Sequence, residues 1–121
     1  MAINYEMRVE EELIIVVSSG VCDDLDQLKE YVLALHDAVT ALEQTRILVD
    51  ETQLEYRLGT IDSYYSGEFM SEIEPKPYKL AIVCRQEGWN DTKFWETVAV
   101  NRGVPVRVFV DKDRAEEWVR E

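Results

Sequence analysis

The chain has 121 residues, a length typical of one domain, and its 46% hydrophobic content suffices for a core that needs no disulfide or metal. Its 25 acidic and 13 basic residues give a net charge of −12. A field of that sign repels nucleic-acid phosphates and anionic lipid headgroups, so the composition argues against nucleic-acid binding.

The sequence carries no pattern for secretion or for membrane insertion. Residues 1–8 lack the basic-then-apolar pattern of a signal peptide, and no run approaches ~18 apolar residues. Cys22 and Cys84 match neither a CxxC motif nor a metal-ligand spacing. A cytosolic cysteine pair is usually reduced, although pairing between these two stays open. We therefore expect one cytoplasmic domain over residues 1–121, without membrane insertion.

The chain opens with a predicted β-hairpin. Residues 3–9 alternate weakly between apolar and polar side chains, as a half-buried strand does. After a polar break at residues 10–12, residues 13–17 run continuously apolar, which indicates a strand deep in a sheet. Gly20 ends the hairpin.

A long amphipathic helix follows. Asp24 and Gln27 form a capping box at its start. Apolar residues then recur at three- and four-residue steps, at Leu25, Leu28, Val32, Leu35, Val39 and Leu42. This stripe predicts a helix of about twenty residues with one buried face. Leu33 lies well off the stripe and is expected to be exposed, and His36 lies at its edge.

The middle of the chain predicts a strand and a second helix. Residues 46–50 are rich in β-branched side chains and end in an acid, which indicates a buried parallel strand, and residues 51–59 are expected to be irregular. Thr60 or Asp62 can cap the helix. Its predicted core face has a four-residue spacing and comprises Ile61, Tyr65, Phe69 and Ile73. Gly67 weakens this helix by about 1 kcal/mol relative to Ala.

Two further strands are predicted at residues 78–84 and 104–110, with Pro105 tolerated near the start of the second. Between them, Asp91 caps a helix that ends at Gly103. The residues that this helix presents to the core are Phe94, Trp95 and Val98.

A capping box at Asp113 and Glu116 predicts a closing helix. The residues that dock it on the core are Ala115, Trp118 and Val119. The element order is then β-β-α-β-α-β-α-β-α, and strands that alternate with helices pair in parallel through right-handed crossovers. We therefore predict an α/β fold with a mixed, mostly parallel sheet of about five strands, helices packed on it, and a hairpin formed by the first two strands.

Three features carry a resemblance to a known family: the opening hairpin that ends at Gly20, the strand at residues 46–50, and the tail at residues 106–111 followed by Ala115 and Trp118. With the element order, they resemble the SpoIIAA-like members of the STAS superfamily over nearly the whole chain. The resemblance implies a SpoIIAA/STAS-like fold and a non-catalytic regulatory or interaction module that binds a protein partner or a small ligand.

In the anti-sigma-factor antagonists of this superfamily, a serine at the start of the helix after the third strand is phosphorylated and switches partner binding. The pair Asp62-Ser63 is similar to their Asp-Ser pair, so the resemblance gives Ser63 as a candidate phospho-acceptor. Tyr64 and Tyr65 stand where a small residue and Gly are expected, and the loop from Asp50 is longer than in those antagonists.

Ligands of open parallel sheets gather outside the carboxyl ends of the strands. In this chain the residues at those ends would form a mixed rim for a ligand or a partner, and they are Asp50, Glu51, Arg85, Trp89 and Asp111. The alternative is ordinary loop surface with Trp89 packed on the core.

Aromatic side chains gather between residues 56 and 69, and such side chains are enriched at protein interfaces. Helix core explains Tyr65 and Phe69, but adjacent Tyr64 cannot share their face. We expect exposed Tyr64 and Leu33 to mark a self-association surface, and the protein to be a homodimer.

The sequence contains no G-x-S-x-G, G-x-G-x-x-G, P-loop, D-x-D-x-D-G or H-x-x-x-H motif. We therefore predict no enzyme activity, no metal and no cofactor. A hydrolase or thiol enzyme would need Cys22 or Cys84 within ~3–4 Å of His36.

The first functional hypothesis is thus an interaction module that acts through contacts with an unidentified protein partner. The alternative is a carrier of a small apolar ligand or lipid. Its pocket would be lined by Phe69, Met70 and Ile73.

Overall fold

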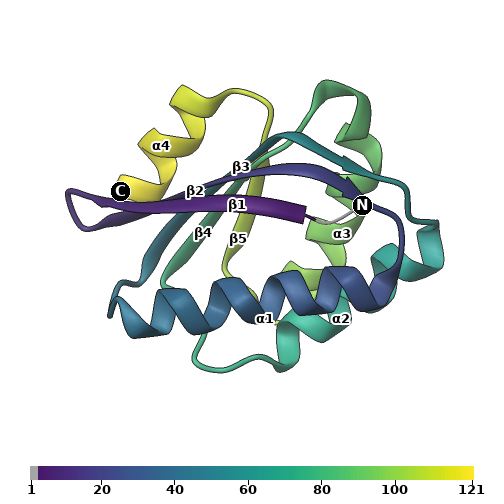
Figure 1. The fold of residues 1–121 in the computed structure, drawn as a ribbon, viewed down its shortest axis with the longest axis horizontal. Helices are drawn as coiled ribbons and strands as arrows, with labels where there is room; N and C mark the ends of the chain where they lie inside the picture. Colours follow the sequence, from purple (N-terminus) through teal and green to yellow (C-terminus); the bar gives the residue numbers. More distant parts are fainter. Residues whose placement is uncertain (1–2) are drawn as a thin grey trace.

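Five strands form one sheet in the computed structural model, which describes residues 3–121 (Figure 1). They are β1 (Ile3–Glu10), β2 (Leu13–Cys22), β3 (Arg46–Tyr56), β4 (Lys79–Val83) and β5 (Val106–Phe109), and they lie in the sheet in chain order. β1 pairs with β2 antiparallel, and all other pairs are parallel. The predicted mixed, mostly parallel sheet with an opening hairpin is therefore confirmed. Met1 and Ala2, which the one-domain prediction included, lie outside the described residues.

Three helices cover one face of the sheet and one helix covers the other in the described part of the chain (Figure 1). The three are α1 (Leu25–Ala41), α2 (Thr60–Glu72) and α3 (Trp89–Asn101), and the fourth is α4 (Lys112–Arg120). A short 3₁₀ turn, η1 (Gln86–Gly88), precedes α3. Because each parallel crossover is right-handed and moves on to the next strand in one direction, α1, α2 and α3 fall on the same face. None of the helices within residues 3–121 is long and apolar enough to cross a bilayer.

β2 shows why the predicted apolar run is continuous. Ile14 and Val16 face the core under α1 and α3, whereas Leu13 and Ile15 face the core under α4. All four are almost fully buried. A strand covered on both faces needs apolar side chains at every position, so the alternation of a half-buried strand is lost.

The helix boundaries follow the predicted caps at α1 and α3 only in part. The Asp24 side chain accepts a hydrogen bond from Gln27 N at 2.7 Å, which confirms this cap. α1 ends at Ala41, so it is shorter than predicted, and Leu42 is exposed beyond it. α3 begins before Asp91 and leaves Phe94 exposed, whereas Gly103 follows its end with a positive φ of 89°, as predicted for a C-terminal glycine.

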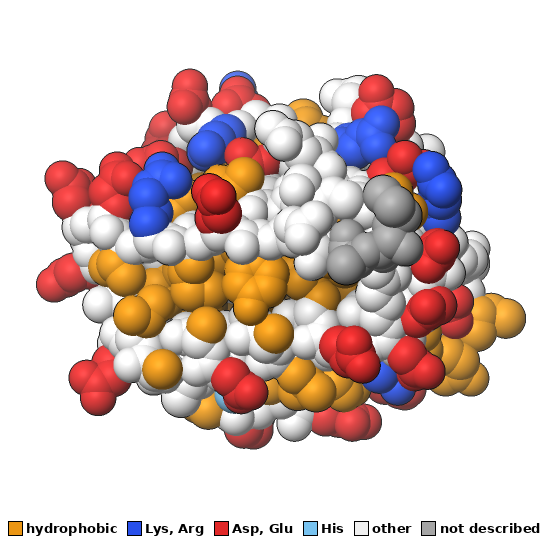
Figure 2. Space-filling model, viewed as in Figure 1, with side chains coloured by type: hydrophobic (Ala, Val, Ile, Leu, Met, Phe, Trp, Pro, Cys, Tyr) orange, Lys and Arg blue, Asp and Glu red, His pale blue; other side chains and the backbone are white. Residues whose placement is uncertain are grey.

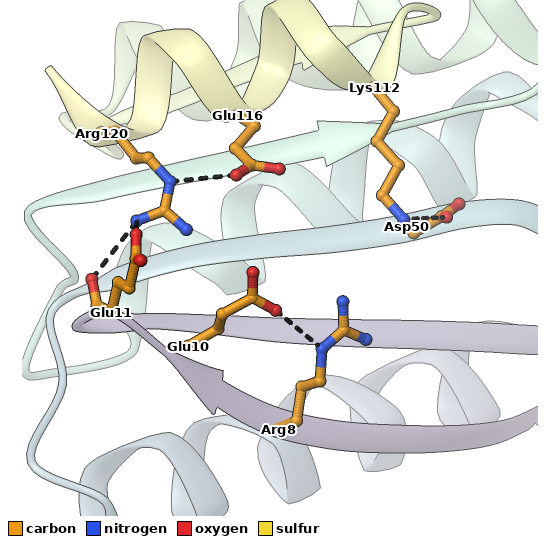
Figure 3. A network of polar contacts seen from close by, with 7 residues as sticks. All are labelled: Arg8, Glu10, Glu11, Asp50, Lys112, Glu116 and Arg120. Atoms are coloured by element: carbon orange, nitrogen blue, oxygen red, sulfur yellow. Dashed lines mark hydrogen bonds and ion pairs between the residues drawn. The ribbon is translucent and has the colours of Figure 1, made fainter.

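α4 is fixed to the sheet by polar contacts as well as by its apolar face (Figure 3). Arg120 Nε donates to Glu116 Oε2 at 3.0 Å, and its Nη1 donates to the backbone oxygen of Glu11 at 3.3 Å. The predicted capping box at Asp113 and Glu116 is wrong. Asp111 caps the helix instead and accepts from Asp113 N at 2.9 Å, while the Glu116 carboxylate is bound to Arg120.

The prediction of an irregular segment after residue 50 is also wrong for residues 51–56, which continue β3. β2 carries a register shift between Val17 and Ser19 and then pairs with this second half of β3. Leu54 is almost fully buried there. A neighbouring strand that supplies a ladder outweighs the low strand propensity of a polar segment.

The predicted core face of α2 is wrong. Ile61 is 70% exposed and Tyr65 is 48% exposed, whereas the buried residues of this helix are Ser66 and Gly67. Gly67 has no side chain, which allows α2 to approach α3 closely. The helix begins after Gly59, with no side-chain cap from Thr60 or Asp62. Apolar spacing misled the prediction because the helix packs through its smallest residues.

Gly67 provides a direct test of this packing. A Cβ at residue 67 would lie 2.8 Å from Val98 Cγ1 and 3.3 Å from the backbone oxygen of Trp95. Overpacking of this kind costs about 1–3 kcal/mol, which exceeds the gain of about 1 kcal/mol in helix propensity. We expect Gly67→Ala to lower the free energy of unfolding in urea. Val98→Ala also removes buried methyl groups, so the double variant Gly67→Ala with Val98→Ala should lose less than the sum of the two single losses. A stabilised Gly67→Ala variant would contradict the close packing.

Candidate functional site

An apolar cavity of about 370 Å³ lies between α1, α2 and the sheet. Its wall is largely aliphatic and includes Val16, Val32, Leu35, Val39, Val49, Met70, Ile73 and Ile82. On the face seen in Figure 2, hydrophobic side chains form a continuous band between β1 and α1. The helical cover of the sheet is therefore incomplete on this side.

β3 brings a carboxylate into this cavity. Successive side chains of a strand point to opposite faces of the sheet. Val49 faces the core under α1 and α3, and Glu51 lines the cavity on that face. Asp50 points the other way and pairs with Lys112 of α4, Oδ2 to Nζ at 3.4 Å (Figure 3). Glu51 is buried at a position where the pattern of the strand calls for an apolar side chain.

Two tyrosines hold the Glu51 carboxylate. The hydroxyls of Tyr31 and Tyr56 donate to Glu51 Oε2 at 2.8 and 3.0 Å. Ser18 Oγ lies 2.6 Å from the Tyr31 hydroxyl. Because the single proton of Tyr31 goes to Glu51, Ser18 donates to Tyr31. The four side chains form one hydrogen-bonded cluster from α1, β2 and β3.

The second oxygen of this carboxyl, Oε1, has no hydrogen-bond donor among residues 3–121. In the same part of the chain, no fully buried side-chain oxygen or nitrogen lacks a partner. Oε1 is therefore accessible, and Glu51 lines both this cavity and a second one of about 270 Å³. The cluster thus holds one carboxylate oxygen that is free to accept a further hydrogen bond.

Burial raises the pKa of the Glu51 carboxyl to about 7, and the negative charge of Asp50 acts in the same direction. The hydrogen bonds from Tyr31 and Tyr56 oppose this shift. Burial and the Glu51 charge in turn raise the pKa of both tyrosine hydroxyls well above the usual range. The tyrosines therefore remain donors, and Glu51 is the group of this cluster that titrates near neutral pH.

The structure distributes the five predicted rim residues over both faces of the sheet. Asp50 and Asp111 lie on the α4 side, where Asp111 caps the helix. Glu51 and Arg85 both line a second cavity of about 270 Å³ at the carboxyl ends of β3 and β4. Trp89 packs on the core at the start of α3. The described residues thus bring together Glu51 and Arg85 from this set, and a role for the whole rim stays a prediction.

The predicted surface and phosphorylation residues also have definite places. Leu33 on α1 and Tyr64 on α2 are exposed, as expected, and Arg102 Nη2 donates to the Tyr64 hydroxyl at 2.8 Å. Ser63 lies half-buried in the first turn of α2 and lines the large cavity. Self-association through Leu33 and Tyr64, and phosphorylation of Ser63, stay predictions.

The polar partners of His36 and Cys22 bear on the thiol-enzyme alternative, and the two side chains contact different backbone carbonyls. His36 Nε2 lies 3.2 Å from the Pro75 carbonyl oxygen, whereas the Cys22 thiol donates to the Asp24 carbonyl at 3.6 Å. Burial raises the pKa of the Cys22 thiol to about 11 and that of Cys84 above its usual value. Both are free, buried thiols rather than activated thiolates. Within residues 3–121, no group of three or more His, Cys, Asp or Glu side chains is placed to hold a metal ion.

Sequence reasoning named Glu51 but missed Tyr31 and Ser18. Tyr31 lies three residues after Leu28, on the inward face of α1, and Ser18 interrupts the apolar run of β2. Each of these residues places a hydroxyl on a face that was predicted to be buried. Because buried polar groups require partners, the two hydroxyls were the signal from which a buried polar cluster could have been predicted.

Neither the family models nor the curated proteins contain a match to this chain. Two solved structures share its fold. An anti-sigma factor antagonist from Mycobacterium paratuberculosis aligns with a TM-score of 0.65 and 17% identity over 99% of this chain and 96% of its own. An uncharacterised protein of the DUF3478 family with a SpoIIAA-like fold, from Shewanella loihica, aligns with a TM-score of 0.54 and 19% identity over 98% and 94%. The chain therefore has a SpoIIAA-like fold, as the resemblance implied.

Proposed function

We propose that the protein is a non-catalytic interaction module that pairs with a second copy of itself through the free edge of β1. The observation that carries this proposal is the open edge itself, since β1 has β2 as its only strand neighbour in the described sheet. The structural neighbour named as an anti-sigma factor antagonist supports a role in protein contacts. Regulation of a further, unidentified protein partner is part of the same proposal.

The outer edge of β1 presents unpaired backbone groups. A two-residue turn at Glu11 and Glu12, both with positive φ, closes the hairpin on the pair Glu10–Leu13. The pair next to such a turn exchanges both backbone hydrogen bonds, and alternate pairs repeat this pattern. The N–H and C=O groups of Tyr5, Met7 and Val9 therefore point away from β2, where another strand can bind them.

The side chains of β1 suit an antiparallel pairing with itself. With Met7 opposite Met7 of the other copy, Tyr5 lies opposite Val9, and Glu6 lies opposite Arg8. Tyr5 and Val9 are exposed in the single chain, and pairing would cover them. Opposite charges in a cross-strand pair are favourable, so this register is complementary in charge as well as in hydrogen bonding. The apolar band beside β1 in Figure 2 extends the surface that a second copy would cover.

Charge reversal tests this register by sedimentation of the full chain. We expect a dimer for the unmodified protein and about a tenfold weaker dimer for Glu6→Arg or Arg8→Glu, because each places like charges opposite one another twice. The double variant Glu6→Arg with Arg8→Glu restores the pairs and should restore the dimer. A monomer at all concentrations, or a double variant no better than the single ones, would overturn the proposal.

The large cavity favours a second candidate function, the binding of a small apolar molecule. Its volume of about 370 Å³ lies in the lower part of the range of small-molecule sites, which are typically apolar with a few polar groups. Native mass spectrometry of freshly purified protein should then show a bound apolar compound. Absence of any such compound, together with no shift in melting temperature on addition of apolar ligands, would contradict this candidate.

A further inference from the structure

The Glu51 carboxyl lacks the partner that a buried charge requires. Each charged side chain buried in a protein is normally paired or fully hydrogen-bonded, because desolvation of an isolated charge is costly. Glu51 receives two neutral hydroxyl donors on Oε2, and no Lys, Arg or His within residues 3–121 forms an ion pair with it. Oε1 is thus free to accept from a cationic ligand, and Glu51 lines the large cavity.

The cluster is built to keep this acceptor in place. Tyr31 is oriented by Ser18 on one side and donates to Glu51 on the other, and Tyr56 donates from the same strand as Glu51. The carboxylate therefore cannot turn to solvent without breaking one buried and one partly buried hydrogen bond. An acceptor held this way at an apolar cavity selects a ligand by the chemistry of its head group.

We propose that the cavity binds an apolar amine, with the ammonium group of the ligand bonded to Glu51 Oε1 and its hydrocarbon body against the aliphatic wall. This inference rests on the apolar-ligand function proposed above and specifies its ligand class. An ammonium supplies both the hydrogen bonds and the positive charge that Oε1 lacks. An alcohol supplies one hydrogen bond without charge, and a carboxylate is repelled.

The overall charge of the chain also favours an amine as the ligand. With a net charge of −12, the protein attracts cations to its surface and repels anionic amphiphiles. The cavity wall then separates apolar amines from hydrophilic ones, because only the former gain from burial of their hydrocarbon body. The net negative charge attracts a cationic ligand, the aliphatic wall favours one with a hydrocarbon body, and Glu51 favours one with an ammonium group.

A head-group series tests the proposal with the full chain. Octylamine, 1-octanol and octanoate are titrated by calorimetry into the unmodified protein, into Glu51→Gln, and into Glu55→Gln as a control. Glu55 lies on the same strand but outside the large cavity, and its substitution removes the same charge. We expect octylamine to bind the unmodified protein and Glu55→Gln about tenfold more tightly than octanol, and octanoate not to bind. Glu51→Gln should lose this preference while it keeps its affinity for octanol.

The outcomes separate the two proposals. Equal affinities for octylamine and octanol in the unmodified protein would overturn the amine assignment and leave the apolar-ligand function standing. Failure of both compounds to bind would overturn the ligand-binding function itself. Octylamine binding that Glu51→Gln leaves unchanged would show adsorption to the acidic surface and would also overturn the assignment. The comparison of octylamine with octanol in the unmodified protein can overturn the assignment even where Glu51→Gln fails to fold.

Discussion

Glu51→Gln is expected to stabilise the protein at pH 8 and to change its stability little at pH 5. The amide oxygen of Gln can still accept from Tyr31 and Tyr56, but the side chain carries no charge to desolvate. The difference in free energy of unfolding between variant and unmodified protein should therefore grow by about 2.5 kcal/mol from pH 5 to pH 8. Urea denaturation at the two pH values measures it.

The direction follows from the pKa of Glu51 in the two states. Burial raises the pKa in the folded state to about 7, from an ordinary value of 4.5. Between these values the folded state binds more protons than the unfolded state, so the free energy of unfolding falls as the pH rises. The contribution of neutral Glu51 is fully present below 4.5 and is lost as the pH rises through about 7. The groups that act on Glu51 include Tyr31, Tyr56 and Asp50.

A control isolates this effect from the titration of the acidic surface. Glu55→Gln removes an exposed carboxylate from the same strand, and its difference from the unmodified protein should not grow in the stabilising direction between pH 5 and pH 8. A Glu51→Gln difference that is the same at both pH values would show that Glu51 does not titrate in this range.

The second large effect is expected for Glu96, which protects the other edge of the sheet. Glu96 is buried on α3, and its Oε2 accepts a hydrogen bond from Val108 N of β5 at 2.7 Å. Its Oε1 accepts from Lys93 Nζ at 2.6 Å. Glu96→Ala leaves a buried backbone N–H without an acceptor, so we expect the free energy of unfolding to fall by about 2–3 kcal/mol in urea.

Glu96→Gln is the matched control for this prediction. Its amide oxygen still accepts from Val108 N, so the loss should stay below about 1 kcal/mol. Lys93→Gln removes the half-exposed ion pair and the cation–π contact with Trp89 but keeps the hydrogen bond to Val108 N, so it should cost less than Glu96→Ala. Equal losses for Glu96→Ala and Glu96→Gln would show that the hydrogen bond to the strand edge contributes nothing.

The parts of the fold that sequence predicted are those in which local pattern and burial agree. The apolar run of β2 and the stripe of α1 are examples, since their periodicity states directly which faces are covered. The second half of β3 depends on a register shift in β2, and α2 depends on the fit of Gly67 against Val98. Neither contact leaves a periodic trace in the sequence. The strand was therefore predicted to end too early, and the helix α2 was predicted but was given the wrong core face.

The candidate site was likewise predicted only where local sequence was enough. Glu51 was predicted as a site residue because it directly follows a predicted strand. Its partners Ser18 and Tyr31 come from β2 and α1, and only the crossover that stacks α1 on the sheet brings them to β3. A cavity is likewise a property of packed elements, so its wall could be guessed only at Met70 and Ile73, while Phe69 does not line it.

The order of the strands bears on how the protein is made. Every strand of the described sheet lies beside the strand that precedes it in the chain. As the chain leaves the ribosome, each new strand can pair with the edge strand formed just before it. No strand must insert between two strands that have already paired. The helix α4 follows all five strands in the chain and covers strands that are already in place.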